Sequence, residues 1–243
     1  MKHLSSLRII KLGTICFTAS EIASTVTLKI KSDLGIGGGS TSTLIDGERK
    51  ILVDTSFDCE WLDDPINNER NASNLVRSLG DLGIVPGDID AVFITHWHRD
   101  HFGNLGVFPK AQRLASKRLV ERFGLEDFIG VDDQEEIGDG VKVMLTPGHT
   151  IDHASVMVNT VLGGMKARIA IAGDAIISDA YFQSGRIWQY NADFYDLGAA
   201  RESMLRLINA SDLVIPGHGV PFMAYHPNAM PKNSRLCGSA DES

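Results

Sequence analysis

The sequence predicts one α/β domain in which histidine and aspartate side chains gather at the carboxyl ends of strands. The 243 residues are 43% apolar, which is enough for a sizeable core, and no shift in composition marks a second domain. Short apolar, β-branched runs alternate with amphipathic helical patterns. Several of these runs are followed directly by histidine or aspartate. Open α/β sheets bind their ligands at this carboxyl end of the strands.

The apolar patterns place the elements in chain order. Strands are predicted at residues 7–12, 24–31, 43–45, 51–53, 91–94, 141–146, 154–158, 167–172 and 211–215. Helices are predicted where apolar residues recur at three- and four-residue steps, at residues 71–82, 115–123 and 199–208. Irregular or solvated surface is expected at residues 56–68 and 132–136. The predicted domain covers residues 1–231, and the polar residues 232–243 are expected to form a flexible tail.

Charge and cysteine usage exclude several classes of protein. The formal net charge of −8 gives no general attraction to phosphate backbones or anionic membranes, so a small-molecule substrate is expected rather than a nucleic acid. No apolar run approaches the ~20 residues of a membrane span, and Lys11 interrupts the N-terminal stretch, which predicts a cytoplasmic protein. Three distant cysteines, Cys16, Cys59 and Cys237, form neither a disulfide framework nor a metal knuckle.

The densest cluster of candidate ligands follows the predicted strand at residues 91–94. It is the stretch His96-Trp97-His98-Arg99-Asp100-His101, with three imidazoles and one carboxylate. Without a cation, such groups forced together would lack counter-charge and hydrogen-bond partners. A solvated turn with accidental histidines is the alternative, but the pattern H-x-H-x-D-H directly after a strand favours a metal site.

Further candidate ligands follow other predicted strands. Asp54 follows the strand at 51–53, where it could simply start a turn or accept a hydrogen bond from a metal-binding imidazole. His149, Asp174 and His218 each follow a later strand. Chance explains one or two such endings. Because five of only eight histidines are placed in this way, a shared site is the better interpretation.

Two other stretches near these residues invite a functional interpretation. The glycine cluster at residues 35–40 suggests a phosphate loop, but a strand follows it instead of a helix, which favours a flexible loop near the site. Residues 176–196 could form a lid or pocket wall, or pack this insertion against the domain. The side chains that suggest a pocket wall are Tyr181, Phe182, Arg186, Trp188, Tyr190, Phe194 and Tyr195.

The candidate ligands resemble the five motifs of the metallo-β-lactamase superfamily. Those motifs are an acid after an early strand, H-x-H-x-D-H, a later histidine, a later aspartate and a last histidine. They stand here in that order, over nearly the whole chain, as Asp54, His96, His98, Asp100, His101, His149, Asp174 and His218. The resemblance implies an α+β fold, the four-layer αβ/βα sandwich, with two face-to-face sheets, helices outside and the site at the sheet edge.

The same resemblance implies a role for each candidate ligand. One metal would be held by His96, His98 and His149, the second by Asp100, His101 and His218, and Asp174 would bridge them. The expected cofactor is two zinc ions (Zn2+) per chain, although these ligands also accept iron or manganese. Asp100 is in addition the candidate catalytic residue, which would orient the attacking water. Three histidines that match no motif are expected in loops or on the surface: His3, His153 and His226.

The resemblance implies a hydrolase whose bridging water or hydroxide attacks an ester, thioester, lactone or amide. Asp174 is similar to the bridging acid of the glyoxalase II, lactonase and phosphodiesterase branches, whereas antibiotic-hydrolysing members have Cys or Ser there. Promiscuous β-lactam hydrolysis is therefore expected only as a side activity. A phosphodiesterase or ribonuclease stays open, since residues 101–109 are similar to animal proteins linked to RNA processing, and so does a mononuclear iron persulfide dioxygenase. A non-catalytic binding module is disfavoured, because no ligand is missing.

Overall fold

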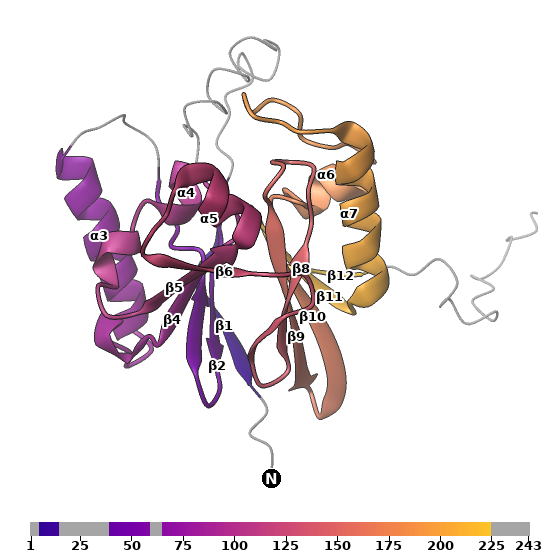
Figure 1. The fold of residues 1–243 in the computed structure, drawn as a ribbon. Coiled ribbons are helices and arrows are strands. Elements are labelled where there is room, and N and C mark those ends of the chain that lie inside the picture. Colours follow the sequence, from indigo (N-terminus) through magenta and orange to yellow (C-terminus); the bar gives the residue numbers. More distant parts are fainter. Residues whose placement is uncertain (1–4, 15–38, 59–64, 225–243) are drawn as a thin grey trace, which may run out of the picture.

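A computed structural model of the protein describes residues 5–14, 39–58 and 65–224. Two six-stranded sheets face each other, and helices cover the outer face of each sheet (Figure 1). This arrangement is the four-layer αβ/βα sandwich, so the predicted fold class is confirmed. Among the described residues, no helix is both long and apolar enough to cross a membrane.

The first sheet contains the N-terminal strands in chain order. They are β1 (Ser6–Lys11), β2 (Ser42–Asp46), β3 (Lys50–Val53), β4 (Ala91–Ile94), β5 (Gln112–Ser116) and β6 (Phe128–Val131). The first three strands are antiparallel, and the strands from β3 to β6 are parallel. The carboxyl ends of β3 and β4 consequently meet at one edge.

The second sheet contains the remaining strands in reverse order from its far edge. They are β7 (Glu136–Gly138), β8 (Val141–Leu145), β9 (Ala154–Leu162), β10 (Met165–Gly173), β11 (Leu213–Pro216) and β12 (Phe222–Met223). Only β10 and β11 pair in parallel. Because β9 runs opposite to both β8 and β10, the strands β8, β10 and β11 all end at the same edge.

Helices pack on the outside of the sandwich. The longer ones are α3 (Pro65–Gly80), α5 (Lys117–Phe123) and α7 (Leu197–Ala210), and the short ones are α4 (Arg99–Phe102) and α6 (Asp179–Gln183). Two 3-10 turns, η1 (Pro86–Asp88) and η2 (Leu105–Val107), join elements of the first half. In Figure 1, α3 lies outside the first sheet and α7 outside the second, so the two halves of the chain mirror each other.

Strand β4 shows why the core has more than one layer. All four of its residues are buried, as expected for a parallel strand covered on both faces. Ala91 and Phe93 join the cluster between the two sheets, whereas Val92 and Ile94 join the cluster beneath α3. A third cluster, which includes Leu207 of α7, covers the outer face of the second sheet. These three layers hold the strand ends of both sheets in one rigid frame.

The prediction for α3 was wrong at its N-terminus, because the helix begins at Pro65 and not at residue 71. Proline at the first position favours a helix start. The buried face runs through Asn67, Asn71, Leu75 and Leu79, so its first two positions are polar and give no apolar period. The Asn71 side chain exchanges two hydrogen bonds with the backbone of Asp58, which satisfies its buried amide.

Several strands were also missed or shortened. β5, β6, β7 and β12 were not predicted, and β9 and β10 extend beyond the predicted ranges. Residues 115 and 116, predicted as helix, belong to β5. The acidic run at 132–136 is exposed, as expected. The predicted strand at 24–31, residues 35–38, the tail at 232–243, His3 and His226 lie outside the described residues.

Candidate metal centre

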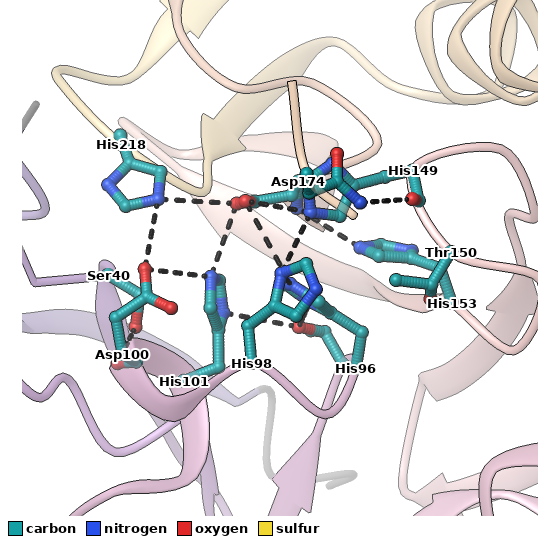
Figure 2. A network of polar contacts seen from close by, with 12 residues as sticks. Ser40, His96, His98, Asp100, His101, His149, Thr150, His153, Asp174 and His218 are labelled. Atoms are coloured by element: carbon teal, nitrogen blue, oxygen red, sulfur yellow. Dashed lines mark hydrogen bonds and ion pairs between the residues drawn. The ribbon is translucent and has the colours of Figure 1, made fainter. Parts of the chain in front are cut away.

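The seven predicted metal ligands converge at the shared sheet edge. They come from the segments that follow β4, β8, β10 and β11, the first of which includes the short helix α4, and Figure 2 shows their side chains pointing toward one another. The structure divides them into two buried groups, each of which could hold a metal ion. Group one contains His96, His98, His149 and Asp174, and group two contains Asp100, His101 and His218. That they bind metal stays a prediction, and the short distances between their buried ligand atoms support it.

Group one brings three imidazole nitrogens and one carboxylate oxygen together. His98 Nδ1 lies 2.9 Å from His96 Nε2 and 3.1 Å from His149 Nε2. Asp174 Oδ2 lies 3.3 Å from His149 Nε2 and 3.9 Å from His96 Nε2. The four atoms therefore surround one point.

Group two adjoins group one through Asp174. The Oδ1 atom of Asp174 lies 3.3 Å from His101 Nε2 and 3.5 Å from His218 Nε2. Asp100 Oδ2 lies 3.6 Å from His101 Nε2 and 3.4 Å from His218 Nε2. Asp174 thus presents one carboxylate oxygen to each group.

Hydrogen bonds on the outer side of the imidazoles fix which nitrogen faces inward. The outer nitrogen of His98 donates to Asp193 Oδ1 at 2.9 Å, and that of His101 donates to Asp54 Oδ2 at 2.7 Å. The outer nitrogen of His218 faces the Thr14 carbonyl at 3.3 Å. Each of these contacts places the proton outside and the lone pair toward the group, which is the usual arrangement for metal-binding histidines.

The same reasoning applies to His96. Thr95 Oγ1 donates its proton to Asp54 Oδ2 at 2.8 Å and therefore accepts from His96 Nδ1 at 3.0 Å. The 2.9 Å contact between His96 Nε2 and His98 Nδ1 consequently joins two lone pairs. Two acceptors at this distance repel each other unless a cation lies between them.

The spacing of the donor atoms fits a bound metal ion, as the ligand distances of zinc illustrate. Ligand atoms about 2.0–2.1 Å from a tetrahedral zinc ion lie about 3.3 Å from one another. The separations of 2.9–3.9 Å in group one and 3.3–3.6 Å in group two bracket this value. Among the described residues, neither His101 Nε2 nor Asp174 Oδ1 has a hydrogen-bond partner. A metal ion would satisfy both atoms.

The histidines of the two groups differ in protonation when no metal is bound. Burial, reinforced by neighbouring histidines, holds the pKa of His96 well below its usual value, and burial lowers the pKa of His149 to about 3. These imidazoles stay neutral, as metal ligands must be. Burial also opposes the charged form of His218, but the Asp174 and Asp100 carboxylates outweigh it and raise the pKa of His218 to about 10. Without metal, group two therefore takes up protons to balance its carboxylates.

Asp54 occupies the position expected for an acid that orients a metal-binding imidazole. Its carboxylate accepts from His101 Nδ1, from the Thr95 hydroxyl and, at 2.9 Å, from the Thr95 backbone N–H. Its φ of 57° lies in the left-handed region, which non-glycine residues rarely adopt. These three hydrogen bonds hold the strained backbone and the histidine together, a combination typical of functional sites.

His153 lies in a loop, as expected, between β8 and β9, but the prediction that it has no particular role there was wrong. His153 is buried, and its Nε2 accepts from the Asp174 backbone N–H at 3.1 Å. Ser155 Oγ donates to the Ala172 carbonyl, so the Thr146 hydroxyl donates to Ser155 and accepts from His153 Nδ1. This relay fixes the tautomer of His153 and with it the backbone of Asp174. Spacing alone could not reveal it, because β8 and β9 bury His153 only after folding.

Asp193 is a second functional candidate that sequence reasoning missed. Besides accepting from His98, it accepts from Asn191 Nδ2 at 3.1 Å, and Asn191 Nδ2 also donates to the His149 carbonyl at 2.8 Å. Arg122 of α5 contacts Asp193 at 3.5 Å and Asp152 at 2.8 Å. Burial raises the pKa of Asp193, but the hydrogen bond from His98 outweighs it and holds the pKa well below its usual range. Asp193 is therefore an ionised acceptor for a ligand histidine.

The aromatic stretch after Asp174 lines a cavity beside group one. His149 and Asp174 form part of its wall, and four of the side chains singled out from the sequence form another part: Tyr181, Phe182, Arg186 and Trp188. Trp188 is buried and meets Tyr181 edge-on, with ring centroids 5.5 Å apart. Packing and wall formation, left open by the sequence, thus occur together.

Gly217 is required for Asp174 to keep its position. A Cβ atom at residue 217 would collide with Asp174 Oδ1 and would lie 2.9 Å from the Gly173 carbonyl carbon. We expect Gly217→Ala to lower the bound metal per chain and to destabilise the protein by about 1–3 kcal/mol, as overpacking does. Elemental analysis and urea unfolding test this. Gly87→Ala, which meets no atom within 4 Å, is the control, and equal metal content in both variants would contradict the expectation.

An αβ/βα sandwich with two His/Asp groups at its sheet edge is the architecture of a metal-dependent enzyme class. The family model of the metallo-beta-lactamase superfamily matches residues 35–218, and the chain belongs to that superfamily. Human metallo-beta-lactamase domain-containing protein 1 is 31% identical over 224 residues, which cover 90% of this chain and 77% of the human protein. The Xenopus laevis protein of that name is 34% identical and covers 79% of this chain and 76% of its own length.

Solved structures show the same fold. A candidate metallo-beta-lactamase from Thermotoga maritima superposes with a TM-score of 0.63 at 21% identity, covering 91% of this chain and 100% of the other. A quorum-quenching N-acyl homoserine lactone lactonase superposes with a TM-score of 0.61 at 20% identity. The match covers 90% of this chain and 92% of the lactonase chain. Recognition of the family from its motifs is thereby confirmed.

Proposed function

We propose that the protein is a hydrolase that uses two zinc ions, one in each group. The position of Asp174 carries this proposal. Its Oδ2 faces the three histidines of group one, and its Oδ1 faces His101 and His218 of group two. A carboxylate shared in this way would hold two cations close together, and the cations would satisfy the buried acceptor atoms that face each group.

When bound, the ions would polarise a carbonyl and lower the pKa of bound water to about 7. The protein's own residues would hold the metal ions and orient the attacking water. Asp174 stays ionised, because His101, His218 and His149 outweigh the effect of burial and hold its pKa well below the usual value. Asp100 faces group two from the short helix α4 and is the side chain that we assign to orienting the attacking water.

The substrate class that we propose is an ester, thioester, lactone or amide. The cavity beside group one supports a substrate with an apolar part, since Ile176, Ile187 and Met204 line it together with Trp188. The acid at the bridging position resembles the glyoxalase II and lactonase branches. β-Lactam hydrolysis is expected only as a side activity.

The first experiment is metal content per chain in protein purified without added metal, followed by hydrolysis assays on the same sample. The panel contains a thioester, a lactone, a β-lactam and bis-p-nitrophenyl phosphate. About two zinc ions per chain with ester or lactone turnover supports the proposal. Phosphodiester turnover alone would replace it with a phosphodiesterase or ribonuclease. One iron per chain without hydrolysis would replace it with a persulfide dioxygenase.

A further inference from the structure

The cavity beside group one is apolar along most of its wall and contains one basic side chain. The apolar and aromatic residues come from the loop after β10, from α6, from the segment between α6 and α7, and from α7. They include Ile176, Phe182, Ile187, Trp188 and Met204. Two ligand residues of group one, His149 and Asp174, lie in the same wall. A molecule bound at the metals therefore has an apolar space beside it.

Arg186 is the basic residue of that wall. Its backbone N–H donates to the Tyr181 carbonyl at 3.1 Å, which fixes its place at the end of α6. Its guanidinium has no hydrogen bond or ion pair within the part of the chain that the structure describes. Arg122 and Arg168, by contrast, are paired with aspartates at 2.8 Å and 2.7 Å.

An unpaired arginine beside an apolar cavity suits a ligand with a carboxylate and an apolar part. Its planar guanidinium binds a carboxylate through two parallel hydrogen bonds, which a neutral group cannot reproduce. The protein carries a net charge of −8, so an anionic ligand is repelled overall, and a cationic side chain in the cavity wall favours its binding. Arg186 supplies that cation next to the ligand histidines.

We propose that this cavity recognises an amphiphilic anion, with its apolar part against Trp188 and Met204 and its carboxylate on Arg186. The proposal rests on the proposed function in one respect, since it makes the substrate an ester, thioester, lactone or amide that carries a free carboxylate. Arg186 is then a specificity-determining residue and takes no part in the bond-breaking step.

Calorimetric binding to the metal-loaded protein tests the proposal without requiring turnover. The probes are 4-phenylbutyrate and its neutral amide, 4-phenylbutanamide. We expect Arg186→Gln to weaken binding of the acid at least about tenfold and to leave the amide unchanged, because a hydrogen bond to a charged group is lost. Arg186→Lys should retain part of the preference. Arg201→Gln, an exposed arginine of α7 outside the cavity wall, should change neither affinity.

A second variant separates the cavity from the metals. Met204→Trp fills the apolar space, so it should weaken the acid and the amide alike. If Arg186→Gln leaves the preference for the acid intact, the metals alone hold the carboxylate and the proposal is overturned. It is also overturned if Met204→Trp leaves both affinities unchanged. Binding as expected without any hydrolysis would reject the proposed hydrolase and keep the anion site.

Discussion

Asp174→Ala is expected to remove bound metal from both groups and to lower turnover at least about a hundredfold. The variant deletes the one carboxylate that contacts both His149 of group one and His101 of group two. Loss of residues that only orient ligands already costs 10–100-fold in metal affinity or activity, and loss of a shared ligand costs more. Metal analysis and the hydrolysis panel measure the two effects.

The fold should survive this substitution. Asp174 Oδ1 has no hydrogen-bond partner among the described residues, so its removal breaks no internal hydrogen bond at that atom. Circular dichroism of the metal-free protein is expected to match that of the unsubstituted protein. Urea unfolding should show a lower free energy of unfolding, because Asp174 is a counter-charge of the protonated His218. Asp81→Ala changes an exposed aspartate beyond α3 and serves as the matched control. Two metal ions and full turnover in Asp174→Ala would reject the bridging role.

Asp193→Asn is expected to weaken metal binding at group one by about 10–100-fold and to leave group two unchanged. Asp193 accepts the proton of His98 Nε2 and so directs the Nδ1 lone pair toward the other ligands of group one. Asparagine has nearly the same shape but no charge, and its amide can present a donor to His98. The imidazole then loses the partner that fixes its tautomer.

Stepwise titration of the metal-free protein with zinc, against a chromophoric chelator, measures the two affinities separately. Only the group one step is expected to change in Asp193→Asn. Asp212→Asn is the control, because Asp212 also pairs with an arginine, Arg168, but lies far from the centre at the start of β11. If both steps shift equally in Asp193→Asn, Asp193 stabilises the fold and does not position a ligand.

The sequence by itself determined the fold class, the order of the main elements and the residues that form the two groups. The candidate ligands follow strands, and strands are visible as local apolar patterns. The order of these ligands resembles the metallo-β-lactamase motifs, and that resemblance implied the fold class and the two groups. The sequence could not place the start of α3, where Asn67 and Asn71 occupy buried positions. Polar residues on a buried face leave no apolar period to detect.

Only the tertiary structure decided which atoms face each other and what supports them. Asp193 lies 95 residues from His98, and Arg122 lies 71 residues from Asp193, so no local pattern links them. His153 becomes a buried acceptor for Asp174 only when β8 and β9 close over it. The cavity and its unpaired arginine arise in the same way. Ligand positions depend on where strands end, which is a local property, whereas the tautomer, charge and surroundings of each ligand depend on contacts between distant segments.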